Sequence, residues 1–208
     1  MQYKKYVVSH INILSQFDAL EMEETYLYED PRIPLMKSSL AVIELVRTQR
    51  ILVEQNKVKV VSNKPLNDFI LDAVLEWSSE GEYQLDDFLR SHAENINMRS
   101  CTSLIAQNVM EDIDGIVRIT SFRKSLLREA LIDALEGYSD SYPMTAVLSV
   151  LARVYDPNAS LLFRFLNQQF DEEVMKSLYM LSSPWSSYPD AEKKQINMVL
   201  SSLYSISQ

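Results

Sequence analysis

The sequence predicts a mainly α-helical domain that carries one or two small β-hairpins. Apolar residues recur at three- and four-residue spacing through most of the chain, which is the period of an amphipathic helix. Only 3 of the 208 residues are glycine, which leaves few positions for primed hairpin turns or glycine-rich phosphate loops. Hydrophobic residues make up 47% of the sequence and charged residues 24%, a balance typical of folded globular proteins. We therefore expect a single domain over residues 1–208.

The segment that organises the rest of the chain is residues 38–77. Its first part predicts a helix with one apolar and one polar side, formed respectively by Leu40, Ile43, Leu45 and Val46 and by Glu44, Arg47 and Thr48. From residue 50 the period changes to two, which predicts a hairpin with its turn at residues 55–57. After a break at residues 62–65 the helical period returns. A second helix is expected over residues 66–79, based on the spacing of Phe69, Ile70, Ala73, Val74 and Trp77.

The remaining elements follow from the same periods. We expect a helix at residues 3–17, then a mobile loop over residues 18–34 that contains two prolines. A short helix begins with Asp86 and Asp87, and a longer helix over residues 97–113 carries Leu104, Ile105, Val109 and Ile113 on its inner side. A turn at residues 114–115 leads to a strand at residues 116–120, so that a helix is again followed by an extended segment, as in a winged-helix unit. Helices are predicted over residues 121–136, 143–154, 161–170, 172–181 and 191–206.

The bulk properties exclude several classes of protein. The net charge of -9 disfavours nonspecific nucleic-acid binding, including DNA binding by winged-helix units. No apolar run approaches the roughly 18 residues that a membrane-spanning helix needs, and the apolar run near the start is too short for a secretion signal. The single cysteine, Cys101, cannot form an internal disulfide, which fits a reducing compartment. We expect a cytoplasmic protein.

No pattern of catalytic or metal-binding residues stands out. The two histidines, His10 and His92, are far apart and in no ligand spacing, and we interpret both as surface or capping residues. Cys101 is placed in the first turn of a helix, where a buried, inert thiol is the simplest interpretation. The acidic pair Asp86 and Asp87 is explained by a helix start, where carboxylates complement the macrodipole. The sequence therefore predicts a protein that is not an enzyme and needs no cofactor or metal, unless distant residues converge.

One segment carries an excess of positive charge. Residues 116–129 have a local net charge of +3, contributed by the basic residues Arg118, Arg123, Lys124 and Arg128. Arg99 on the preceding helix and Lys37 could join this basic face. Guanidinium groups bind phosphate bidentately, and a cytoplasmic membrane surface attracts clustered cations by about 1 kcal/mol each. The face could thus bind an anionic headgroup, although a solvated helix face explains the same residues.

The order of these motifs resembles that of the Golgi phosphoprotein 3 family over roughly the whole chain. The matching text is the Ile-Glu-Leu of residues 43–45, the helix of residues 67–75, the junction formed by residues 105–111 and 114–117, and the apolar helix of residues 144–152. The resemblance implies a helical fold of the same kind and no enzymatic activity. It also implies a peripheral membrane adaptor that binds an acidic lipid and carries glycosyltransferase tails to coatomer.

The resemblance also suggests a lipid headgroup site. Arg99 matches the first of two arginines that hold phosphatidylinositol 4-phosphate in the family, and Thr102 stands at the position of the second. Ser38, with Lys37 beside it, replaces a third arginine, and Tyr28 supplies the aromatic residue of a headgroup-binding loop. Two of the three guanidinium groups are therefore absent, and with them most of the bidentate phosphate contacts. The hairpin that the family uses for self-association is shortened here, which leaves the oligomeric state open.

Two functions of different class follow. The first is a peripheral membrane protein that binds an anionic, phosphoinositide-like lipid through Arg99 and the basic face. The second is an interaction module that binds a protein partner and has lost the lipid site. A large exposed apolar patch would favour the protein partner over the lipid.

Overall fold

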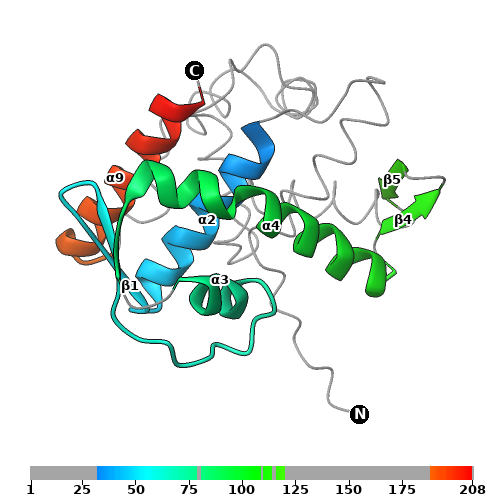
Figure 1. Ribbon diagram of the computed structural model, residues 1–208, viewed down its shortest axis with the longest axis horizontal. Helices are drawn as coiled ribbons and strands as arrows, with labels where there is room; N and C mark the ends of the chain where they lie inside the picture. Colours follow the sequence, from blue (N-terminus) through cyan, green and yellow to red (C-terminus); the bar gives the residue numbers. More distant parts are fainter. Residues whose placement is uncertain (1–31, 79–80, 109, 114–115, 120–187, 208) are drawn as a thin grey trace, which may run out of the picture.

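A computed structural model describes residues 32–78, 81–108, 110–113, 116–119 and 188–207. These residues form four helices, a three-stranded antiparallel sheet and a separate two-stranded one (Figure 1). The elements are α2 (Arg32–Arg47), β1 (Ile51–Glu54), β2 (Lys57–Val60), α3 (Leu71–Trp77), β3 (Glu82–Gln84), α4 (Leu85–Ala106), β4 (Met110–Ile113), β5 (Ile116–Ile119) and α9 (Asp190–Ile206). The prediction of a mainly helical protein with small hairpins is confirmed at this level.

Helix α2 forms the centre of the described core. It packs against α4 and α9, and α4 crosses over it in Figure 1. The helix is buried nearly all round, and Lys37, Ser38 and Ser39 are buried together with its apolar residues, which are Ile33, Met36, Leu40, Ala41, Val42, Ile43, Leu45 and Val46. Arg47 is exposed and Glu44 half-buried, which confirms the predicted polar side.

The start of α2 corrects the predicted loop over residues 18–34. The helix begins at Arg32, six residues before the expected start, and includes Pro34. A proline in the first turn of a helix loses no hydrogen bond, because the amide groups there have no partner within the helix. Residues 18–31 lie outside the described part of the chain.

The three-stranded sheet is built on the predicted hairpin. In β1 and β2, Glu54 pairs with Lys57 and Val53 with Val58, so the turn has two residues rather than three. Gln55 and Asn56 both have positive φ, at 50° and 61°, which fits the twist of a two-residue hairpin. The third strand, β3, pairs antiparallel with β2 and was not predicted. It has only three residues, which are too few to establish a period of two.

Helix α9 covers the outer edge of the sheet. The backbone N–H of Val53 in β1 donates a hydrogen bond of 2.9 Å to the side-chain oxygen of Gln195. Val53 is fully buried, so this amide group would otherwise be an unpaired donor on an edge strand. The same helix buries Ile196, Val199, Leu200 and Leu203 in the core. The predicted C-terminal helix is thereby confirmed.

We expect Gln195→Ala to lower the free energy of unfolding by about 1–3 kcal/mol, because it leaves the partly buried N–H of Val53 without its acceptor. Chemical denaturation followed by circular dichroism measures this. Asn197→Ala, at an exposed position of the same helix, is the matched control and should change stability by less than about 0.5 kcal/mol. Equal effects of the two substitutions would show that the Val53 bond does not stabilise the edge.

Helices α3 and α4 differ from their predictions in length. Helix α3 has seven residues, Leu71–Trp77, instead of the expected 66–79. It is shortened at its start because the Asp68 carboxylate accepts hydrogen bonds of 2.9 Å from the N–H groups of Ile70 and Leu71, which caps the chain there. Helix α4 is a continuous 22-residue helix that joins the two helices expected at residues 85–89 and 97–113. Asp86 and Asp87 lie in its first turn, as predicted.

The end of α4 is also corrected. The helix stops at Ala106, and Met110–Ile113 forms β4, which pairs with β5 in register Met110 to Ile119. Residues 110–113 are therefore strand rather than helix. Helix α4 is followed by a hairpin, as α2 is. The helices predicted at residues 3–17 and between residues 121 and 181, and the turn at residues 114–115, fall outside the described residues.

Candidate functional site

Arg99 on α4 lies against two aromatic rings from the neighbouring segment. Its guanidinium carbon is 4.7 Å from the centroid of the Phe69 ring and 4.8 Å from that of Trp77. One guanidinium nitrogen also lies 3.5 Å from the backbone oxygen of Phe69. A guanidinium group over the face of an aromatic ring is attracted by about 0.5–1 kcal/mol at exposed sites. The two rings therefore hold Arg99 in a defined position.

The two rings stand at opposite ends of α3. Phe69 lies in the turn capped by Asp68, just before the helix, and Trp77 is the last residue of the helix. Their backbone positions are fixed by Ile70, Leu71 and Val74, which are buried in the core. Packing of these apolar residues thus presents the two aromatic side chains to the Arg99 side of α4.

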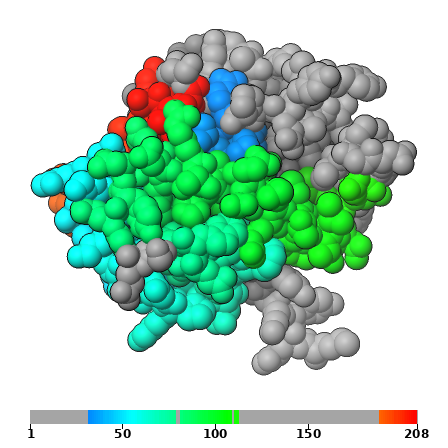
Figure 2. All heavy atoms as spheres, viewed as in Figure 1, coloured from blue at the N-terminus to red at the C-terminus, as the bar shows by residue number. Residues whose placement is uncertain are grey.

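The rings remain open to solvent. Phe69 is 57% exposed, Trp77 36% and Met98 53%, and these are three of the five large apolar side chains that are exposed among the described residues. Thr102, one turn after Met98, is exposed as well, and its hydroxyl donates to the Met98 backbone oxygen at 2.9 Å. We call Phe69, Trp77, Met98, Arg99 and Thr102 the Arg99 patch. Helix α3 (teal) and α4 (green) lie side by side on the face that Figure 2 shows.

The spacing of Phe69 and Trp77 suggested a helix stripe, whereas both side chains lie at the surface. A seven-residue helix makes barely two turns. Phe69 lies before this helix and Trp77 at its end, so their helical spacing does not show whether their side chains are buried. The apolar spacing does not distinguish these two rings from core residues, although Asp68 is a residue type that marks a helix start next to Phe69. Arg99, in contrast, is indicated by the family resemblance.

The charges along these two segments are mostly negative. In the sequence, Asp68 precedes Phe69, and Asp72 and Glu76 lie between Phe69 and Trp77. Glu94 precedes Arg99 on α4. Residues 68–78 and 94–102 together carry a net charge of -3. Arg99 is the one cation of these two segments.

His92 lies behind Trp77. It is 8% exposed, and its ring stacks on Trp77 with centroids 5.9 Å apart and an interplanar angle of 12°. The Phe88 ring meets it edge-on at 4.4 Å, and its Nε2 is 3.3 Å from the Ser78 hydroxyl. Burial lowers the pKa of His92 below its usual 6.5. The expectation of a surface or capping histidine is therefore wrong, because His92 lies in the interior of α4 on its core side.

Lys37 and Ser38 belong to α2, and they face a different side of α4 from the one that carries Arg99. Both are fully buried in α2, and the Lys37 ammonium donates a hydrogen bond to the Asn97 side chain. Asn97 and Arg99 are two residues apart, which turns them by about 200° around a helix. The structure therefore does not bring Lys37 and Ser38 to the patch that contains Arg99. The Ser38 hydroxyl is buried and has no hydrogen-bond partner among the residues that the structure describes.

The other predicted site residues are only partly described. Arg118 lies in β5, where its Cα partner in the register is the acidic Glu111. Tyr28, Arg123, Lys124 and Arg128 lie outside the described residues. Cys101 is half-buried and lies in the second half of α4, not in a first turn as expected. The basic face and the aromatic loop therefore stay predictions.

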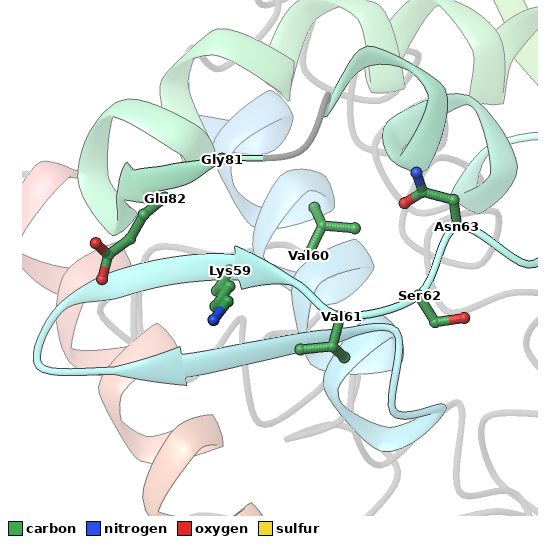
Figure 3. Close-up of a pocket in the computed structure, with 7 residues that line it drawn as sticks. All are labelled: Lys59, Val60, Val61, Ser62, Asn63, Gly81 and Glu82. Atoms are coloured by element: carbon green, nitrogen blue, oxygen red, sulfur yellow. The ribbon is translucent and has the colours of Figure 1, made fainter.

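A separate hollow lies at the open end of the three-stranded sheet. It has a volume of about 630 Å³ and is formed where β2 continues beyond its pairing with β3 (Figure 3). Its lining consists of Lys59, Val60, Val61, Ser62, Asn63, Gly81 and Glu82. Among the described residues no group of three or more histidine, cysteine or acidic side chains could hold a metal ion.

Comparison with known proteins adds no family. A scan of the sequence against models of protein families gives no match, and a search of curated proteins finds no significant relative. None of the described helices is both long and apolar enough to cross a bilayer. The function must therefore be argued from the Arg99 patch itself.

Proposed function

We propose that the protein is a non-enzymatic interaction module that binds a protein partner through the Arg99 patch. The observation that carries this proposal is the pair of exposed rings, Phe69 and Trp77, which both contact one guanidinium group. Aromatic residues, methionine and arginine are the residue types enriched at protein interfaces. Tryptophan, tyrosine and arginine also dominate the residues that contribute most to binding energy.

The patch is ordered before binding. Stacking against two rings reduces the freedom that the Arg99 side chain would lose on binding, and immobilising a flexible side chain costs about 0.5–1.5 kcal/mol. The aromatic residues stand at the ends of a helix whose other side is buried, so their backbone positions are fixed too. Less of the interaction energy is therefore spent on ordering.

The chemistry of the patch indicates the kind of partner. A guanidinium group binds a carboxylate through two parallel hydrogen bonds, while Phe69 and Trp77 offer apolar surface beside it and Met98 is a further exposed apolar side chain of α4. We therefore propose a partner segment with one aspartate or glutamate flanked by apolar side chains. The acidic residues around the patch favour basic residues at the edges of that segment.

Binding of an anionic lipid headgroup is the competing proposal. It is favoured by the partly exposed Arg99 and by the family resemblance. Against it stand the net charge of -3 along the patch segments and the full burial of Lys37 and Ser38. A headgroup at Arg99 would meet one cation rather than a cluster, and one cation near a membrane surface is worth about 1 kcal/mol.

Selection from a random peptide display library tests the proposal with a defined probe. We expect the wild type to enrich peptides that carry an acidic residue next to apolar residues, and Arg99→Ala to lose this enrichment. Arg90→Ala is the matched control, because Arg90 is an exposed arginine of the same helix. Sedimentation with vesicles that contain phosphatidylinositol 4-phosphate provides the second arm. Headgroup-selective vesicle binding that Arg99→Ala abolishes, without any peptide enrichment, would replace the protein partner by a lipid.

A further inference from the structure

Trp77 connects the Arg99 patch to a titratable group in the interior. The Arg99 guanidinium lies 4.8 Å from its ring centroid, and the His92 ring stacks on the same indole at 5.9 Å. The indole is therefore shared between a surface cation and a buried imidazole. A change in the charge of His92 therefore acts directly on Trp77, which is part of the Arg99 patch.

Neutral imidazole suits the surroundings of His92, and imidazolium does not. The ring lies between Trp77 and Phe88, and within the part of the chain that the structure describes its polar contact is with the Ser78 hydroxyl. That hydroxyl already donates to the Val74 backbone oxygen at 2.6 Å, so it offers an acceptor to His92 only through its lone pairs. A buried charge without an ionic partner is costly.

No carboxylate among the described residues is placed to compensate the charge. On α4 the charged residue that shares the face of His92 is Arg99, seven residues or about two turns on. At the end of α3, Trp77 and the following Ser78 contact the ring, while Glu76 is exposed. Strand β3 contributes Tyr83, which contacts Phe88 at 5.6 Å. A protonated His92 would therefore place a second cation on the indole that Arg99 already occupies.

We propose that protonation of His92 opens the contact between α3 and α4 and withdraws Trp77 from the Arg99 patch, so that binding is switched off in mildly acidic solution. The imidazolium gains water by this opening, which involves Trp77 at the last residue of α3 and leaves the buried Ile70 and Val74 in the core. The conformational step stands independently of the partner. Only its effect on binding rests on the proposed function.

The direction of the pH dependence follows from the pKa of His92, which is lower in the folded chain than its usual value of 6.5. The unfolded or opened state then binds the proton more readily than the closed state. Above about pH 6.5 both states are neutral at His92 and the closed state is not affected. As the pH falls from there towards the folded pKa, the closed state is progressively destabilised.

Fluorescence of Trp77 tests the switch without any ligand. The chain has two tryptophans, so Trp185→Phe leaves Trp77 as the only indole. From about pH 7.5 to about pH 5, the usual range of histidine switching, we expect a red shift and stronger acrylamide quenching. His92→Gln and His92→Phe should both lack this response, the second while keeping an aromatic ring beside Trp77. His10→Gln, which removes the other histidine, should keep it.

The outcomes separate the switch from the proposed function. An emission that does not change over this range, or that changes equally in the two His92 variants, would overturn the switch. For a selected peptide, we expect weaker binding at the acidic end in the wild type and no pH dependence in His92→Phe. A pH response of Trp77 in a protein that selects no peptide would leave the switch standing and reject the function. Peptide binding that does not depend on pH, together with unchanged Trp77 emission, would reject the switch and leave the proposed function standing.

Discussion

Arg99→Ala will weaken binding of a selected peptide by about 2 kcal/mol, or roughly 30-fold, because a central arginine that is fully desolvated in an interface contributes on this scale. Trp77→Ala will have an effect of similar size, since it removes both apolar contact area and the ring that positions Arg99. Isothermal titration calorimetry measures both.

The two effects will not add. Trp77 acts in part by holding Arg99, so the double variant should lose less affinity than the sum of the single losses, as expected for side chains in contact. Arg90→Ala should bind like the wild type. Full additivity would show that the rings bind the partner independently of Arg99 and would contradict the ordered patch. Circular dichroism of each variant checks that the helices are retained.

Leu40→Ala will lower the free energy of unfolding by about 2–5 kcal/mol, the range observed when a buried leucine is cut back to alanine. Leu40 is 1% exposed in the middle of α2, where α4 and α9 both pack against this helix. The cavity is therefore enclosed by elements that cannot easily collapse into it. Equilibrium denaturation in urea gives the value.

Val61→Ala is the control for this core prediction. Val61 is also a branched apolar residue, but it is 53% exposed beside the end of β2. Its truncation should change stability by no more than about 0.5 kcal/mol. A loss for Leu40→Ala as small as that for Val61→Ala would mean that α2 is not the centre of the core.

The position of α2 and of the first hairpin could be predicted because local pattern and tertiary packing agree there. Leu40 and Ile43 belong to an apolar stretch that is buried in the core. Val58 alternates with lysines along a strand. The strand β3 could not be predicted in this way. Its residues pair with β2 through backbone groups, which every sequence carries, and three side chains are too few to establish a period.

The length of α4 was missed for a related reason. Between Leu89 and Leu104 the inner positions include His92, Asn97 and Ser100, so polar residues interrupt the apolar stripe where the chain is nevertheless buried. Asn97 accepts a hydrogen bond from Lys37 and His92 approaches Ser78. Buried polar residues with partners are tolerated in a core. Lys37 is 60 residues from Asn97 and Ser78 is 14 residues from His92, so a local sequence pattern does not show these pairs.

The candidate site also contains residues that the sequence indicates and residues that it does not. Arg99 could be proposed from the sequence, whereas Phe69 and Trp77 were assigned to the spacing of a helix that ends at Trp77. Exposure of the two rings depends on the path of α4, which is set by tertiary packing, and on the cap formed by Asp68, which is a local contact over two and three residues. Lys37 shows the opposite case. Its charge predicted a surface position, and its pairing with Asn97 places it in the interior.

The decisive measurement is a calorimetric titration of a selected peptide into the wild type, Arg99→Lys and Arg90→Ala, run beside vesicle sedimentation of the same proteins. Lysine keeps the charge but loses the planar fork that stacks on two rings and binds a carboxylate bidentately. We expect Arg99→Lys to lose most of the peptide affinity and Arg90→Ala to keep it. Equal peptide affinity in all three proteins, or vesicle binding that lysine supports as well as arginine, would contradict a protein-binding patch built on Arg99.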